Sequence, residues 1–445
     1  MAEGGSSALA TGLPAGVAFR SRDFRLYQSA RLMVILGAEA QSVAVAWQVY
    51  AITHSALDLG FTGLALFLPG LFFMLAAGHV ADRYDRRKII LGCYGLQAVC
   101  TAVLLWLSLS GWALEGGRIW PIYAVLVGIG LGRAFSGPAA SAMLPSLVPK
   151  DHFVNAVTWG ATIYQIANMS GPAVGGILFT LPLAGTLLKW RGAGIVYAFT
   201  LAMLMGFLVL VGMIRISMAP VEKKAFSMRT VLAGLEYVWT TKLLLGSISL
   251  DLFAVLLGGA TALLPIFAID ILHAGPRGLG LLRAMPSVGA LAVSLTMLVR
   301  PIKRKAGKIM LTCVGIFGAA TVVFGLSKSL WVSLVALVLV GASDMVSVVV
   351  RSSILQLATP PEMRGRVSAV NWLFIGASNE FGEFESGLTA HWWGAVRAVV
   401  IGGVASMAVT AAAAGLFPQL RKADALTAES LRGAERELSM AEPAD

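Results

Sequence analysis

Charge is scarce in this sequence. Only 13% of its 445 residues are Asp, Glu, Lys or Arg, whereas soluble domains carry about 25%. Hydrophobic residues make up 57%, and the mean hydropathy is +0.80. Apolar runs of roughly 20 residues recur along the chain, long enough to cross a bilayer as helices. They lack the strict alternation of barrel strands. We therefore predict an all-α protein that crosses a lipid bilayer many times.

Several chemical signatures are also missing. The three cysteines all lie in apolar segments, which argues against a disulfide framework. No two of the five histidines have metal-ligand spacing, and none accompanies a nucleophile in a catalytic pattern. The pair Gly307-Lys308 is followed by Ile, so no Walker A motif is present. The first 25 residues have no signal-peptide core. We expect no enzyme activity, no metal, no cofactor and no cleaved leader.

The distribution of positive charge predicts the orientation of the chain. An even number of spans puts both ends on one side, and we read twelve: 26–53, 59–81, 89–110, 120–147, 154–180, 193–214, 243–271, 278–299, 309–327, 330–357, 367–391 and 395–417. Of the 34 Lys and Arg residues, 24 lie on that side, six on the other and four within spans. Loops rich in Lys and Arg normally stay in the cytoplasm, so both termini should be cytoplasmic. The same bias explains the net charge of +11 without a nucleic-acid partner.

The two halves of the chain repeat each other. The segment KIILGCYG at 88–95 is similar to KIMLTCVG at 308–315, and VNAVTW at 154–159 is similar to VSAVNW at 367–372. Residues 227–239 should form an amphipathic helix at the cytoplasmic face. Repeated halves around a central site are typical of secondary transporters. We predict two pseudo-symmetric six-helix bundles with a linker and two cytoplasmic tails: tail 1–25, bundle 26–214, linker 215–242, bundle 243–417 and tail 418–445.

The loop GHVADRYDRRK, at 78–88, resembles the signature between helices 2 and 3 of the major facilitator superfamily. The residues that match are Gly78, Asp82, Arg83, Arg86, Arg87 and Lys88; Asp85 stands where glycine is commoner. The resemblance implies the major facilitator fold, a monomer in the bacterial inner membrane, and a cytoplasmic gate closed by this loop. The alternative is that these basic residues only fix topology.

GPAVGG, at 171–176, resembles the antiporter motif of drug–proton exchangers in that superfamily, and the residues concerned are Gly171, Pro172, Gly175 and Gly176. The resemblance implies that this bend contacts the matching helix of the other half and limits leak; ordinary close packing is the alternative. Three further segments resemble those of the superfamily branch that includes siderophore exporters: SRDFRLYQSARL, THSALDLG and TPPEMRGRVSAVNW. The likeness runs from about Ser21 to Phe417.

Ten charged residues lie in the interiors of the predicted spans, in addition to Asp270 and Arg397 near span ends. Each costs about 2.5–3.5 kcal/mol near the bilayer centre, so such residues normally face a cavity or a partner. The third, sixth, ninth and twelfth spans have none in their interiors, and these four helices form the outer scaffold in the superfamily. The ten are Arg31, Glu39, Arg133, Asp251, Arg283, Asp344, Arg351, Glu380, Glu383 and Glu385.

Three of these charges crowd the segment SNEFGEFESG. At 100° per residue, Glu380 and Glu383 lie about 60° apart on one helix face, while Glu385 points elsewhere. Two neighbouring carboxylates do not both ionise easily in a cavity, which is what a proton carrier requires. Glu380 or Glu383 is therefore our first candidate for proton coupling, with Asp251 and Glu39 as alternatives. Structural pairing with Arg31, Arg133, Arg283 or Arg351, or contact with a cationic substrate, remain open.

Arg133, in GRAFSGP, lies near the arginine that many proton-coupled members carry on the fourth helix, with one extra residue before the next glycine. We expect a transporter that exports a small amphiphilic drug or siderophore by alternating access, driven by the proton gradient. A lysophospholipid flippase is the alternative, and a membrane enzyme or sensor is a remote one.

Overall fold

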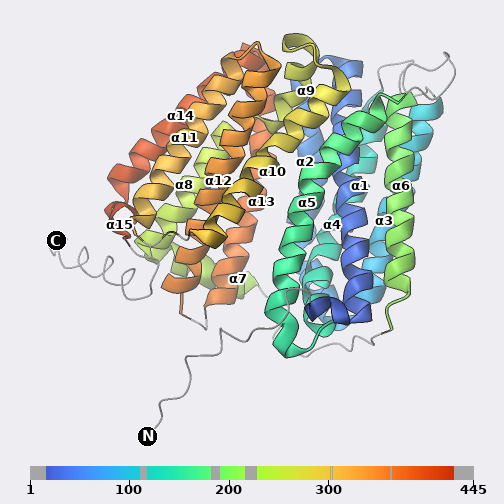
Figure 1. The fold of residues 1–445 in the computed structure, drawn as a ribbon, viewed down its shortest axis with the longest axis horizontal. Helices are drawn as coiled ribbons and strands as arrows, with labels where there is room; N and C mark the ends of the chain where they lie inside the picture. Colours follow the sequence, from blue (N-terminus) through green and yellow to red (C-terminus); the bar gives the residue numbers. More distant parts are fainter. Residues whose placement is uncertain are drawn as a thin grey trace, which may run out of the picture.

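The computed structural model describes residues 17–110, 118–181, 191–215, 228–300, 302, 304–360 and 363–424. Over these residues the chain is helical, and long helices stand side by side in two groups (Figure 1). Residues 1–16 of the predicted tail 1–25, residues 425–445 of the predicted tail 418–445, and residues 216–227 of the predicted linker lie outside the described residues.

The first group of helices comes from the N-terminal half. Ser21 caps the first helix, because its hydroxyl accepts the amide hydrogen of Phe24 at 3.4 Å. The helices are α1 (Arg22–Thr53), α2 (Ala56–Arg83), α3 (Arg86–Ser110), α4 (Trp120–Met143), α5 (Phe153–Phe179) and α6 (Arg191–Gly212). Their bounds lie within four residues of the first six predicted spans.

The second group comes from the C-terminal half and begins with the short α7 (Met228–Thr240), which matches the predicted amphipathic helix. Gly394, with a φ of +83°, makes the tight turn between its last two long helices. The helices are α8 (Lys242–Gly258), α10 (Gly275–Val299), α11 (Ala306–Leu326), α12 (Leu330–Ala358), α13 (Arg364–Trp393), α14 (Ala395–Leu416) and α15 (Pro418–Lys422).

The seventh span departs from the prediction of one continuous helix over 243–271. α8 ends at Gly258, and the chain continues through a 3-10 turn, η4 (Thr261–Leu263), the single turn α9 (Leu264–Ile266) and a π-helical turn, η5 (Phe267–Ile271). Two successive glycines at 258 and 259 are poor helix formers, and Pro265 lacks an amide hydrogen. The span is therefore interrupted inside the protein.

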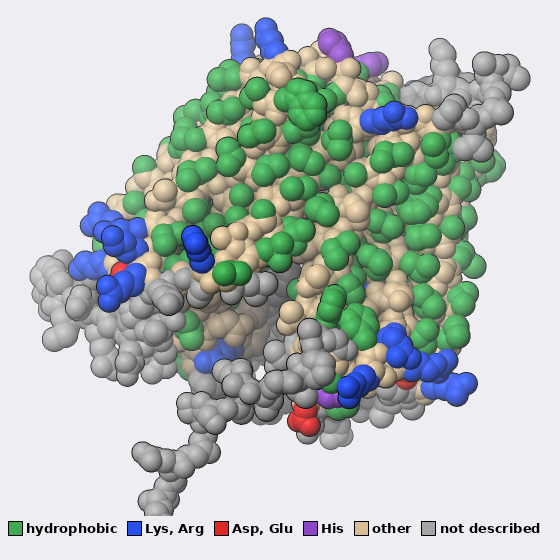
Figure 2. Space-filling model, viewed as in Figure 1, with side chains coloured by type: hydrophobic (Ala, Val, Ile, Leu, Met, Phe, Trp, Pro, Cys, Tyr) green, Lys and Arg blue, Asp and Glu red, His purple; other side chains and the backbone are tan. Residues whose placement is uncertain are grey.

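The described helices fit a membrane-spanning protein. Ten segments, including the interrupted Lys242–Ile271, are long and apolar enough to cross a bilayer. The other two predicted spans are α5 and α13, which have 27 and 30 residues but are not among the ten. Figure 2 shows hydrophobic side chains over the flank, with Lys and Arg at its two ends. Strongly exposed apolar residues such as Phe72, Trp106 and Trp331 suit contact with lipid.

The two groups meet through two helix pairs. α5 packs against α10, and α2 packs against α13. Hydrogen bonds also cross between the groups: Tyr50 of α1 donates to Asp270 of η5, and Arg277 Nε of α10 donates to the Thr180 hydroxyl at 2.6 Å. These contacts involve the end of α5 and the beginning of α10, and we call this the distal end. At the opposite end, where α1 begins, Figure 2 shows the surface hollowed between the groups.

That opposite end carries Arg87, Arg304 and Arg421, and we call it the basic end. Arg87 has a structural role there: its Nε donates to the Val211 carbonyl at 3.1 Å, and its guanidinium also donates to the Gly212 carbonyl. These are carbonyls at the end of α6, where a positive charge is favourable. Arg87 thus ties the beginning of α3 to α6.

Candidate functional site

The space between the two groups contains a polar cavity of about 450 Å³. Its walls come from α1, α2, α4 and α5 of the first group, and from η4, α10 and α13 of the second. We call it the central cavity. The described residues of α3, α6, α11 and α14 are absent from its walls, as the charge census predicted for the outer helices. A cavity shared by both halves is placed where alternating access needs it.

Five of the ten predicted span charges line the central cavity: Glu39, Arg133, Arg283, Glu380 and Glu383. If all five ionised, three carboxylates would face two guanidinium groups, leaving one uncompensated negative charge. None of the three glutamates forms an ion pair within the described part of the chain. Carboxylates that are close to arginines but not tied to them can change protonation without first breaking a salt bridge.

The electrostatic neighbours of the glutamates differ. Arg283 acts on Glu39 and Glu383, and Arg133 acts on Glu39 and Glu380. The Arg283 guanidinium is itself anchored, because it donates to the Ser42 hydroxyl of α1 at 2.7 Å. Since Arg283 belongs to α10 and Ser42 to α1, this hydrogen bond also joins the two halves. Any change of charge at the glutamates therefore acts on residues that connect the groups.

Glu380 and Glu383 lie against the same point of α2. A methyl group built on Gly63 would be 2.7 Å from Oε2 of Glu383 and 3.3 Å from Oε2 of Glu380. The absence of a side chain at Gly63 thus makes room for both carboxylates at the contact between α2 and α13. The structure therefore places the two carboxylates together, on a helix pair that joins the halves.

The other predicted charges lie elsewhere. Asp251, Asp344 and Arg351 line a second, smaller cavity within the C-terminal half. Arg31 lies beside α5, where a methyl group on Gly160 would be 2.9 Å from its guanidinium. Arg31 and Glu385 line neither of these two cavities. The structure consequently divides the candidate proton sites, with Glu39, Glu380 and Glu383 in the central cavity and Asp251 outside it.

Asp251 forms a buried salt bridge. Its carboxylate lies 3.1 Å from Arg351 NH2, and the two side chains are only 7% and 3% exposed. Arg351 also donates to the Asn371 side chain at 2.9 Å. These contacts join α8, α12 and α13. Among the candidate proton carriers, Asp251 is therefore the one with a strong structural partner.

We expect Arg351→Met to lower the stability of the detergent-solubilised protein by about 3–5 kcal/mol, because it leaves the Asp251 carboxylate buried without a partner. The double variant Asp251→Leu with Arg351→Met should regain most of the loss, since no charge is then stranded. Thermal unfolding measures both, with Arg397→Met, at an exposed arginine of the same half, as a matched control. A single variant as stable as wild type would contradict the pairing.

The motif GPAVGG on α5 contacts two different helices, one in each half of the protein. A methyl group on Gly175 would lie 2.8 Å from the Ala40 Cα of α1, within the same half. On Gly176 it would lie 2.7 Å from the Pro276 carbonyl oxygen and 3.0 Å from the Gly280 Cα, both on α10. The partner in the other half is thus α10, the eighth span, and not α13, which is the counterpart of α5 in the sequence repeat. Pro172 itself lines the central cavity.

The candidate gate loop is described only in part. The surroundings of Gly78 and the side chains of Asp82 and Arg83 are not among the features that the structure describes, so the latch stays a prediction. Arg86 is buried at the beginning of α3, and the amide of Arg87 donates to Asp85 Oδ1 at 2.9 Å. Lys88 is exposed.

Sequence reasoning missed the uncharged polar residues of the central cavity. They are Gln41, Ser42, Thr62, Asn168, Thr261, Ser287 and Asn379. Each lies within an apolar span, so a census of all polar residues in the spans, and not only of charged ones, would have found them. They add hydrogen-bonding groups to a wall that also contains apolar residues such as Val45, Leu66 and Leu126. The cavity can therefore accommodate an amphiphilic molecule.

Comparison with known proteins places this arrangement in a family. The model of the family described as transmembrane secretion effector, MFS_3, matches residues 15–442. The chain is similar to the enterobactin exporter EntS of Citrobacter koseri, with 25% identity over 400 residues that cover 88% of each protein. It is equally similar to EntS of Escherichia coli O1:K1, with 25% identity over 398 residues, covering 88% of this chain and 87% of the relative.

Solved structures share the fold. A bacterial homologue of the iron transporter ferroportin, in an inward-facing state, superposes with a TM-score of 0.67 at 15% identity, covering 90% of this chain and 98% of the other. A D-xylose–proton symporter superposes with a TM-score of 0.67 at 13% identity, covering 88% and 97%. At these identities the likeness concerns the fold alone. The helices of this chain are thus arranged as in solved transporters.

Proposed function

We propose a proton-coupled export function for this chain, which belongs to the transmembrane secretion effector family of the major facilitator superfamily. It is a multi-pass membrane transporter, not an enzyme. Within that class, we propose export of a small amphiphilic compound, a drug or a siderophore, across the bacterial inner membrane by a monomer. The six-helix bundles 26–214 and 243–417 would be the moving units.

The observation that carries the proposal is the grouping of Glu39, Glu380 and Glu383 with Arg133 and Arg283 around one cavity between the halves. A substrate that neutralises or displaces an arginine changes the proton affinity of the nearby glutamates, and a proton that binds a glutamate frees an arginine. Substrate and proton binding are thereby linked, as exchange requires. At 100 mV, one proton supplies about 2.3 kcal/mol, which supports a roughly 50-fold gradient of a neutral substrate.

The distal closure supports a cycle of alternating access. With α5 against α10 and α2 against α13, and with the surface hollowed at the basic end, we infer that the central cavity opens toward that end, which is the expected cytoplasmic side. A substrate would enter there, and rocking of the bundles would then open the distal end. Proton entry from outside would return the transporter to the present form.

The lysophospholipid flippase requires a laterally open, apolar cleft. The central cavity contains five ionisable side chains instead, and three of them are carboxylates. A lipid tail would have to pass these groups, which favours a more polar substrate. The second candidate therefore has less support than the exporter.

The test uses purified protein in proteoliposomes with a pH-sensitive dye inside. Catecholate siderophores, cationic drugs and lysolipids are added one at a time, with empty liposomes as the control. We expect at least one siderophore or drug to move protons across the membrane only when the protein is present. Transport of a compound, followed with a label, without any proton movement would contradict proton coupling, and transport of lysolipids alone would favour the flippase.

A further inference from the structure

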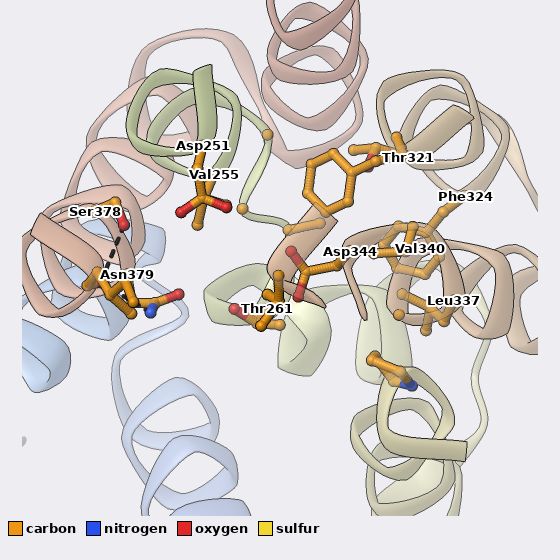
Figure 3. Close-up of a pocket in the computed structure, with 18 of the residues that line it drawn as sticks. Asp251, Val255, Thr261, Thr321, Phe324, Leu337, Val340, Asp344, Ser378 and Asn379 are labelled. Atoms are coloured by element: carbon orange, nitrogen blue, oxygen red, sulfur yellow. Dashed lines mark hydrogen bonds between the residues drawn. The ribbon is translucent and has the colours of Figure 1, made fainter. Parts of the chain in front are cut away.

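The C-terminal half contains a second cavity of about 200 Å³, which we call the C-half cavity (Figure 3). It lies among α8, α10, α11, α12 and α13, and apolar residues such as Phe317, Phe324 and Leu337 form much of its wall. It shares Thr261, Pro286 and Asn379 with the central cavity, but none of the five charges of that cavity lines it. The proposed transport function does not use this space.

If all of its ionisable side chains were charged, the C-half cavity would have an excess of one negative charge. Two carboxylates, Asp251 and Asp344, and one guanidinium, Arg351, line it. Arg351 forms a salt bridge with Asp251 at 3.1 Å and donates a hydrogen bond to Asn371. Asp344 forms no ion pair and no hydrogen bond within the described part of the chain. Figure 3 shows its carboxylate directed into the cavity, on the side of Thr261. A buried carboxylate without a partner is stabilised either by taking up a proton or by a positive charge placed beside it.

The backbone contributes further negative potential. α8 ends at Gly258, and Val255, Gly258, Gly259 and Ala260 all line the cavity. The last carbonyls of a helix have no partner within the helix, and this end carries a partial negative charge. One carbonyl is occupied, because the Ser386 hydroxyl donates to Gly259 at 2.7 Å. Interrupted helices at membrane depth are tolerated where they line a cavity, and in other transporter folds their ends coordinate sodium.

We propose that the C-half cavity binds one small monovalent metal cation, Na⁺, between Asp344, Thr261 and the end of α8. These groups offer a carboxylate, a hydroxyl and carbonyl oxygens, which are ligands for a hard cation. Divalent ions are usually held by more carboxylates, whereas the excess here is a single charge. The volume leaves room for the ion together with water. This site shares Thr261 with the wall of the central cavity but uses none of the five charges there, and it does not depend on proton coupling.

The test measures thermal unfolding of the full-length protein in detergent. Sodium chloride is varied against N-methylglucamine chloride at constant total salt, so that screening stays the same. We expect Na⁺ to raise the Tm of wild type by about 2–4 °C in a saturable manner. Asp344→Asn should abolish the rise. Glu385→Gln, a carboxylate outside both cavities, and Glu383→Gln, in the central cavity, should both retain it.

A second variant keeps the test decisive if Asp344→Asn fails to fold. Thr261→Ala keeps every charge and removes one oxygen ligand, so it should weaken binding of radiolabelled Na⁺ roughly tenfold without changing the Tm in sodium-free buffer. Absence of a Na⁺ effect in wild type would overturn the proposal. A Na⁺ effect that survives both Asp344→Asn and Thr261→Ala would overturn it too, because the ion would then bind elsewhere. Loss of the effect in Glu383→Gln would place the ion in the central cavity.

Discussion

Glu383→Gln is expected to reduce substrate-driven proton movement in proteoliposomes by roughly 100-fold, the usual scale for losing a group that transfers a proton. Glutamine keeps the shape of the side chain beside Gly63 but cannot bind and release a proton. Glu383 is chosen first because its electrostatic neighbours are Arg283 and Glu39. Arg283 in turn donates a hydrogen bond to Ser42 across the two halves. The charge of Glu383 thus acts on contacts that must change during the transport cycle.

The matched control is Glu385→Gln on the same helix. Glu385 lines neither the central nor the C-half cavity, so the variant should move protons at nearly the wild-type rate. Glu380→Gln resolves the remaining ambiguity, because Glu380 lies against the same Gly63 but has Arg133, and not Arg283, as its positive electrostatic neighbour. If both Glu380→Gln and Glu383→Gln move protons normally, the carrier is not on α13, and Glu39 becomes the candidate.

Much of the fold could be predicted because the bilayer imposes it. A helix must satisfy its own backbone in lipid, so apolar length alone predicts a span, and the predicted segments match the observed helices closely. The break after Gly258 was not predicted, because an interrupted helix has the same apolar composition as a continuous one. Two successive glycines and Pro265 were the available signal.

The grouping of the site residues was harder to predict. Helical spacing alone puts Glu380 and Glu383 on one face, and the structure shows both in the central cavity. Spacing does not say which helix that face meets, so the contact with Gly63 of α2 could not be foreseen. Asp251 and Glu39 occupy matching spans of the two halves, yet only Glu39 reaches the central cavity. Asp251 instead pairs with Arg351, because α8 faces α12 and α13 within its own half.

The contact between α5 and α10 leads to the second large expected effect. Gly176→Leu should hold the distal end open, because the Pro276 carbonyl and Gly280 leave no space for a side chain. Overpacking costs about 1–3 kcal/mol. Here that cost falls only on the form in which α5 and α10 touch, so the equilibrium should shift roughly 5- to 150-fold toward the form open at the distal end.

A cysteine at position 46 can report this shift, since Ala46 lines the central cavity and is only 7% exposed. An impermeant maleimide added from the distal side should label Ala46→Cys slowly in the otherwise unchanged protein, and at least several-fold faster when Gly176→Leu is also present. Export should fall in parallel, because the basic end no longer opens. Gly95→Leu is the control, as nothing lies within 4 Å of a methyl group built there. Equal labelling in all three proteins would mean that α5 and α10 do not form the distal seal.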